Sequence, residues 1–211
     1  MTHKMRALVG RFALCRPVRN AWFIYDTMLW YLNGKTSPPS HLVKQKIVRE
    51  YAKKLGIDIL VETGTYLGDM VDAHKDCFKE IYSIELHAAL HERATKRFSK
   101  FPHIHILRGD SGVILPDLLS SMSRACLFWL DAHYSGGITA KGDVETPIVK
   151  EVQSILNHSV LDHAILIDDA RSFDGLDGYP KLEKLEELVI ASQTELVVEV
   201  ENDIIRIHRP L

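Results

Sequence analysis

The sequence predicts an α/β fold in which helices cover both faces of a mostly parallel, doubly wound, seven-stranded sheet. Three observations support this prediction. Strand-like and helix-like segments alternate from residue 41 to the end of the chain. The segments LFWL and AILI are apolar at every position, which is typical of parallel strands that are buried on both faces. The last two strand-like segments can pair only as an antiparallel hairpin across Asn202.

The expected elements follow one another with short connections, so the 211 residues suit one domain with a well-buried core and a short appendage. The prolines of TSPPS (residues 36–40) separate the appendage from this domain, because tandem prolines cannot lie inside a helix. The expected helices span residues 41–55, 67–77, 87–99, 111–122, 146–157 and 179–192. The expected strands span residues 57–63, 79–86, 103–109, 125–132, 163–169, 194–201 and 203–209.

Residues 1–40 form the appendage, a basic and aromatic segment that we expect to be helical. Residues 1–35 contain six basic residues and a single acid, Asp26, and include the aromatic run WFIYDTMLWYL. Three interpretations remain open for it. The helix covers the sheet or an acceptor pocket, it forms a homodimer contact, or it lies on a membrane surface, where basic and aromatic residues are common.

Composition narrows the class of protein. The formal net charge of −2 argues against a nucleic-acid partner, since proteins that follow phosphates usually carry a basic excess. Cys15, Cys77 and Cys126 show no paired spacing, which indicates a reducing compartment. The apolar stretch ALVGRFALC is interrupted by Arg11, and no run is long enough to span a membrane. We therefore expect a cytoplasmic protein, with membrane association through the N-terminus as the alternative.

Acidic residues follow each of the first five expected strands. Ligands of open parallel sheets bind outside the carboxyl ends of the strands, so this edge is the candidate site. A single acid at a strand end is common as a helix cap, but acids at five successive ends favour a functional edge. The residues at these ends are Glu62, Thr63 and Gly64, Glu85, Asp110 and Ser111, Asp131 and His133, and Asp168 and Asp169.

The first of these ends continues as ETGTYLG (residues 62–68), in which Gly64 and Gly68 allow a ligand to approach the backbone closely. Glu85 lies 21 residues beyond Gly64, where nucleotide-binding sheets place the acid that accepts hydrogen bonds from ribose hydroxyls. The alternative is a tight turn with a surface glutamate. Asp110 and Ser111 either contact an adenine amino group or cap the following helix.

Asp131, Asp168 and Asp169 follow two strands that are neighbours in this topology. Three gathered carboxylates repel one another unless they share a cation or a proton, and oxygen ligands favour magnesium. The alternative is that one acid faces a ligand while the others pair with Arg171 or cap helices. His133 is a candidate base, a fourth metal ligand or a simple loop residue.

These residues resemble class I S-adenosylmethionine (SAM)-dependent methyltransferases, whose sheet ends in such a hairpin. Over residues 41–211 the closer likeness is to magnesium-dependent O-methyltransferases of the catechol and macrolide-sugar type, whose first loop has the form Glu-x-Gly-x-Tyr-x-Gly. The resemblance implies a Rossmann-like SAM-binding domain. It implies a metal site, for Mg²⁺ or a similar ion, at Asp131, Asp168 and Asp169. The implied cofactor-binding residues are Glu62, Thr63, Gly64, Tyr66, Gly68, Glu85, Asp110, Ser111 and Asp131.

One departure from the family concerns the base. Catechol-type enzymes place a lysine three residues after the first metal aspartate, and Tyr134 stands there in this chain. His133 is therefore the first candidate for the catalytic base and Lys141 the second.

The expected function is divalent-metal-assisted, SAM-dependent O-methylation of a hydroxyl on a small molecule or a sugar. The segments around residues 129–148 and 165–173 also look like methyltransferase-like proteins found near bacterial surface-glycan genes, which points to a glycan acceptor. The alternatives are a metal-dependent hydrolase or phosphoryl-transfer enzyme, and a non-catalytic module that only binds the cofactor.

Overall fold

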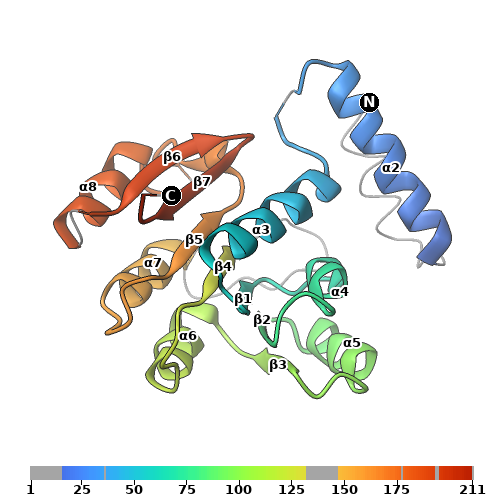
Figure 1. Cartoon of the computed structure of the whole chain (residues 1–211), viewed down its shortest axis with the longest axis horizontal. Coiled ribbons are helices and arrows are strands. Elements are labelled where there is room, and N and C mark those ends of the chain that lie inside the picture. Colours follow the sequence, from blue (N-terminus) through green and yellow to red (C-terminus); the bar gives the residue numbers. More distant parts are fainter. Residues whose placement is uncertain (1–15, 36, 132–146, 177, 193–194, 211) are drawn as a thin grey trace.

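A seven-stranded sheet forms the middle layer of the protein, as the computed structural model shows (Figure 1). The structure describes residues 16–35, 37–131, 147–176, 178–192 and 195–210. The strand order is β3-β2-β1-β4-β5-β7-β6. The strands are β1 (Ile59–Thr63), β2 (Glu80–Glu85), β3 (Ile104–Arg108), β4 (Leu127–Leu130), β5 (Ala164–Ile167), β6 (Val197–Glu201) and β7 (Ile204–His208).

The pairing of the strands confirms the doubly wound sheet and its closing hairpin. Strands β1 to β5 pair in parallel, β7 is antiparallel to β5, and β6 is antiparallel to β7. The two hairpin strands are joined by Asn202 and Asp203, with φ of 53° and 60°, as a two-residue hairpin turn requires. Because β1 has β2 on one side and β4 on the other, the connections after β1 and β4 leave the sheet in different directions. The crevice between them is where ligands of such sheets bind.

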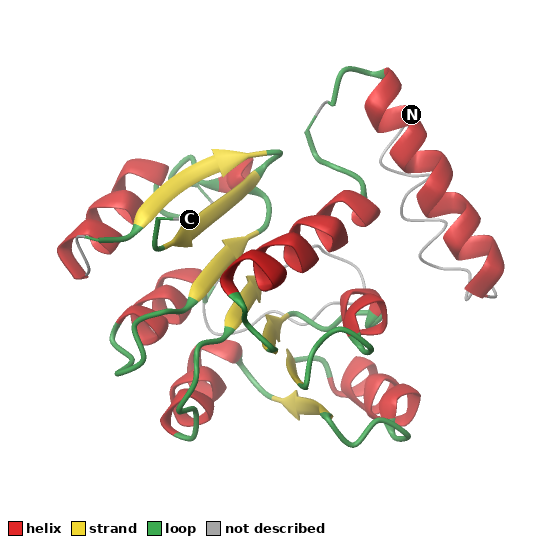
Figure 2. Cartoon of the chain, viewed as in Figure 1, coloured by secondary structure: helices red, strands yellow, loops and turns green. Residues whose placement is uncertain are grey.

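Helices cover both faces of the sheet (Figure 2). Helices α3, α4 and α5 pack on one face, and α6, α7 and α8 pack on the other. Trp129 and Phe128 are neighbours on β4, point to opposite faces, and are 1% and 0% exposed, which explains the uninterrupted apolar run. The helices are α2 (Arg16–Leu32), α3 (His41–Leu55), α4 (Asp69–His74), α5 (Ala88–Phe98), α6 (Ser111–Ser120), α7 (Ile148–Leu156) and α8 (Leu182–Ser192), with a 3-10 turn at Ala170–Ser172.

Helices α4, α5, α6, α7 and α8 are each shorter than the sequence predicts, by two to five residues, and the late starts of α4 and α8 have a visible cause. We expected a helix over 67–77, but α4 begins at Asp69 because Gly68 adopts the left-handed conformation with φ of 73°. We also expected a helix over 179–192, and α8 begins only at Leu182. An antiparallel bridge pairs Lys181 with Asp174, so Lys181 is not part of the helix and α8 begins at the next residue.

The N-terminal segment is helical over Arg16–Leu32, as expected, and α2 packs beside α3 and α4 rather than on the sheet (Figure 1). Trp30 is buried, the Thr27 and Ser40 hydroxyls lie 2.7 Å apart, and the Phe23 ring lies against His41. None of the helices in the described part of the chain is long and apolar enough to cross a membrane. The acceptor-pocket, dimer and membrane-surface interpretations stay predictions. The apolar side chains that remain exposed on α2 are Ile24, Tyr25, Met28, Tyr31 and Leu32.

Candidate cofactor and metal site

The loop after β1 is a closed turn held against β2. The amides of Gly64 and Thr65 donate to the carbonyl of Ile84, and the amide of Gly68 donates to the carbonyl of Thr65 at 2.8 Å. Gly64, Tyr66 and Gly68 all have positive φ, of 87°, 48° and 73°. The loop therefore needs glycine at two of these positions and places Tyr66, which is 42% exposed, at its tip.

Gly68 also meets a steric limit. A Cβ at this position would lie 2.8 Å from Cε2 of Phe98, whose ring is buried against the sheet. We expect Gly68→Ala to lower the free energy of unfolding by about 2 kcal/mol, from left-handed strain and overpacking together. Gly56→Ala is the matched control, because Gly56 has a φ of 66° and no atom within 4 Å of the added Cβ. Urea unfolding should show a loss of about 1 kcal/mol for this control. Equal losses in the two variants would contradict a steric role for Phe98.

Glu85 lies at the carboxyl end of β2 and fixes the loop from the other side. One carboxyl oxygen accepts from the amide of Tyr66 and the other from the amide of His87, both at 2.8 Å. The side chain is buried, so it is not the surface glutamate of the alternative interpretation. Each carboxyl oxygen still has an acceptor position left for a ligand. Binding of ribose hydroxyls by Glu85 stays a prediction.

Glu62 is a buried carboxyl at the end of β1. It accepts a hydrogen bond from the Ser83 hydroxyl, which in turn lies 2.6 Å from the hydroxyl of Thr65. Burial raises the pKa of Glu62 well above its usual value, the Ser83 hydrogen bond opposes this, and the carboxylates of Asp131 and Glu85 raise it further. Several acids therefore face one another across this crevice, and a cationic ligand bound there would stabilise them all.

Asp131, Asp168 and Asp169 come together as the sequence predicts. Each offers a carboxylate oxygen, and these oxygens lie within 4.8 Å of one another at the ends of the neighbouring strands β4 and β5. The amide of Asp169 donates to Asp168 at 2.9 Å, and Asp169 itself has a positive φ of 59°. Three convergent carboxylate oxygens fit a magnesium-like ion, whose preferred ligands are hard oxygens.

The alternative to a metal site, pairing of the acids with Arg171, is also seen for one of the three aspartates. The guanidinium of Arg171 lies 2.8 Å from Asp169 and also pairs with Asp203, the second residue of the hairpin turn. Asp169 thus belongs both to the acidic cluster and to an ion pair at the rim.

Sequence reasoning missed one charged member of this site, Lys44 of helix α3. Its ammonium forms an ion pair with Asp168 and lies 3.9 Å from Asp169. Burial alone would lower the pKa of Lys44, but Asp168, Asp131 and Asp169 together raise it, so the lysine is charged. The order of the elements could have indicated that Lys44 belongs to the site. Helix α3 precedes β1 and runs antiparallel to it, which brings the first turn of the helix to the carboxyl edge of the sheet.

Comparisons with known proteins identify the fold that carries this site. No family model matches the sequence, and no curated protein matches it. The chain is similar to the solved structure of the O-methyltransferase TomG from Streptomyces achromogenes, involved in tomaymycin synthesis, in complex with SAM. That similarity has a TM-score of 0.59, 11% identity and 99% coverage of each chain. It is also similar to the O-methyltransferase from Bacillus cereus in complex with SAH, with a TM-score of 0.58, 9% identity and coverage of 97% and 96%.

A third similar structure is the SAH-bound methyltransferase PaMTH1 from Podospora anserina, with a TM-score of 0.55, 15% identity and coverage of 95% of this chain and 98% of that one. The chain has the fold of the SAM-dependent methyltransferases. In this methyltransferase fold the loop around Tyr66 and the acid Glu85 occupy the crevice at the carboxyl edge, where the sequence predicted the cofactor.

The third strand end of the methyltransferase fold favours the capping interpretation. Asp110 accepts a hydrogen bond from the amide of Gly112 at 2.8 Å and so caps helix α6. Ser111 is buried beside it, next to Thr63 and Glu151. Glu151 is, after Lys44, the second charged residue near the site that the sequence analysis did not identify. Glu151 is fully buried on α7. Contacts of Asp110, Ser111 or Thr63 with a cofactor stay predictions.

Both candidate bases, His133 and Lys141, lie outside the described residues, as does Tyr134. The structure therefore leaves their roles as predictions.

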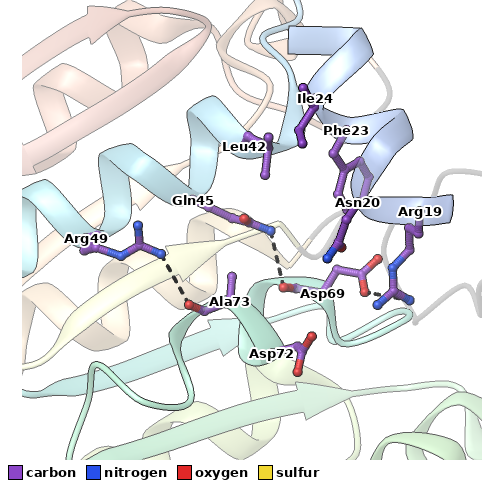
Figure 3. A pocket seen from close by; sticks show the side chains of 10 residues that line it. All are labelled: Arg19, Asn20, Phe23, Ile24, Leu42, Gln45, Arg49, Asp69, Asp72 and Ala73. Carbon is purple, nitrogen blue, oxygen red and sulfur yellow. Dashed lines mark hydrogen bonds and ion pairs between the residues drawn. The ribbon is translucent and has the colours of Figure 1, made fainter. Parts of the chain in front are cut away.

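A pocket of about 330 Å³ lies between α2, α3 and α4 (Figure 3). None of the predicted site residues lines this pocket. Its lining residues are Arg19, Asn20, Phe23, Ile24, Leu42, Gln45, Arg49, Asp69, Asp72 and Ala73.

Proposed function

We propose that this chain is a SAM-dependent O-methyltransferase that acts on a hydroxyl of a small-molecule or glycan acceptor, with a divalent cation held by the aspartate cluster. One observation carries the proposal. The loop ETGTYLG is closed onto the buried acid Glu85 at the ligand-binding crevice of a methyltransferase fold. The similar structures of TomG and the Bacillus cereus protein are O-methyltransferases, which supports oxygen as the acceptor atom.

The charges of the crevice support SAM as the cofactor. SAM carries a sulfonium and an ammonium group, and Glu62, Glu85 and Asp131 supply the negative charges that would balance them. The Gly64 turn would let the backbone approach the cofactor closely, and Glu85 would accept hydrogen bonds from its ribose. Binding in this way mainly positions the methyl group, which is how a site contributes when the cofactor itself supplies the reactive group.

The aspartate cluster would position the acceptor. Asp131, Asp168 and Asp169 would hold the cation, and a bound divalent ion supplies Lewis acidity that lowers the pKa of an acceptor hydroxyl. The carboxylates lie on the same edge of the sheet as the SAM loop, so acceptor and methyl group would meet between β1 and β4. His133 and Lys141, on the connection that follows β4, are the proposed bases.

Isothermal titration calorimetry with SAM and with SAH tests the cofactor, and transfer of a labelled methyl group to phenolic, sugar and glycan acceptors tests the reaction. We expect micromolar binding of SAM and magnesium-dependent labelling of at least one hydroxyl acceptor. A protein that binds neither SAM nor SAH contradicts the proposal. Tight SAM binding without transfer to any acceptor would favour the non-catalytic module. Metal-dependent release of phosphate from a test ester, without SAM binding, would favour the hydrolase.

A further inference from the structure

Helix α3 supplies the aspartate cluster with a cation of its own. Lys44 lies in the first turn of α3, and its ammonium contacts Asp168 and approaches Asp169 to 3.9 Å. The side chain of Lys44 is 15% exposed and that of Asp168 only 1%, so this ion pair is largely withdrawn from water. Lys44 and the cluster come from segments more than 80 residues apart in the sequence, and only the fold brings them together.

The cluster needs such a cation when no metal is bound. The side chain of Asp168 is almost fully buried, and carboxylate oxygens of Asp131, Asp168 and Asp169 lie within 4.8 Å of one another, so three acids crowd a site withdrawn from water. Arg171 compensates only the outer acid, Asp169, and is itself 45% exposed. Removing one partner of a buried ion pair leaves an uncompensated charge and is strongly destabilising. Lys44 is thus the cation in contact with the buried carboxylate of Asp168.

A divalent ion on these carboxylates would compete with the lysine. One oxygen of Asp168 accepts from the amide of Asp169, and the other contacts the ammonium of Lys44. A metal bound by the same three residues would lie within a few ångströms of that ammonium, and two cations so close in a buried site repel each other strongly. The long, flexible stem of lysine allows the ammonium to withdraw when a metal arrives.

We propose that Lys44 is a resident cation of the aspartate cluster and that a divalent metal binds only by displacing it. Asp168 then holds one cation at a time, and Lys44 lowers the affinity for the metal while keeping the empty site stable. The proposal deepens the metal part of the proposed function and rests on it for the identity of the metal site, but it does not depend on methyl transfer.

Manganese binding tests the exchange, because Mn²⁺ replaces Mg²⁺ on oxygen ligands and is counted directly by electron paramagnetic resonance. We expect Lys44→Met to bind Mn²⁺ about tenfold or more tightly than the unmodified protein, because the competing charge is gone. Lys46→Met is the matched control, since Lys46 lies on the same helix, is 65% exposed and pairs with Glu50, away from the aspartates. It should bind Mn²⁺ as the unmodified protein does.

A second comparison locates the ion. Adding Asp168→Asn to Lys44→Met should abolish the tight Mn²⁺ binding, because it removes the carboxylate that the lysine and the metal share. Unchanged or weaker Mn²⁺ binding by Lys44→Met overturns the proposal, and so does tight binding that survives Asp168→Asn. Lys44→Gln, which keeps a polar group beside Asp168 without the charge, replaces Lys44→Met if the methionine variant does not fold.

If neither variant folds, chemical labelling of lysine amines in the unmodified protein tests whether the metal displaces Lys44. Millimolar Mn²⁺ should increase the labelling of Lys44 several-fold and leave Lys46 unchanged, as read by peptide mass spectrometry. No increase at Lys44 overturns the exchange. These readouts separate the inference from the function. Failure to bind SAM would contradict the methyltransferase while leaving the Mn²⁺ result intact, and an unaltered Mn²⁺ affinity would overturn the role of Lys44 while leaving the SAM site intact.

Discussion

Replacing Glu85 with alanine is expected to weaken SAM binding by about 100-fold, which corresponds to about 2.7 kcal/mol. Two losses combine in this variant. The carboxylate would no longer accept hydrogen bonds from the ribose, and charge-assisted hydrogen bonds contribute about 1.5–3 kcal/mol each. The amides of Tyr66 and His87 would also lose their acceptor, which leaves the positive-φ residue Tyr66 without the contact that holds it.

Calorimetric titration with SAM and with SAH measures the effect, and two further variants separate its causes. Glu85→Gln keeps the volume and one carbonyl acceptor, so its loss should be intermediate. Glu80→Ala changes a glutamate of the same strand that is 37% exposed and contacts His105, so it should bind SAM normally. An affinity of Glu85→Ala within threefold of the unmodified protein would show that another group holds the ribose.

The second large effect concerns Glu151, a fully buried carboxyl on helix α7. Burial raises its pKa from the ordinary 4.5 to about 7, and the hydroxyls of Ser111 and Thr63 oppose this rise only in part. Neither carboxyl oxygen makes a well-formed hydrogen bond within the described residues. Ionised Glu151 is therefore poorly compensated where it lies.

The sign of the pH dependence follows from this raised pKa. Between pH 4.5 and about 7 the folded protein keeps the proton on Glu151 and the unfolded chain does not, so this group's contribution to stability falls as pH rises. Above pH 7 the full cost is present, roughly 3 kcal/mol at 1.36 kcal/mol for each pKa unit. Glu151→Gln cannot ionise, so we expect it to be more stable than the unmodified protein by up to roughly 3 kcal/mol above pH 7.

Urea unfolding of the unmodified protein and of Glu151→Gln from pH 5 to pH 8 measures this difference. The two stabilities should converge at the acid end of this range and separate as the pH rises. Glu187→Gln is the control for the chemical change itself, because that side chain of α8 is 70% exposed, and it should change the stability by less than Glu151→Gln does at pH 8. A pH-independent difference for Glu151→Gln would mean that Glu151 is not protonated in the folded protein near neutral pH.

Much of the fold could be predicted because its signals are local. Apolar runs such as the one containing Phe128 and Trp129 identify strands that are buried on both faces. The alternation of strands and helices then leaves few topologies, since parallel crossovers are right-handed. The boundaries of α4 and α8 were less accurate. Gly68 and the bridge between Asp174 and Lys181 delay those helices through backbone conformation and pairing, and hydrophobic periodicity does not report either.

The sequence by itself determined which residues stand at the strand ends. The order of strands places Glu62, Glu85, Asp131 and Asp168 at one edge whatever the side-chain packing, because parallel strands all end on the same side. Only the tertiary structure decided how each charge is compensated. Lys44 meets Asp168, Arg171 takes Asp169, and Glu151 is left nearly uncompensated. Such contacts join residues distant in the chain, and their charges depend on burial, which no local pattern of residues encodes.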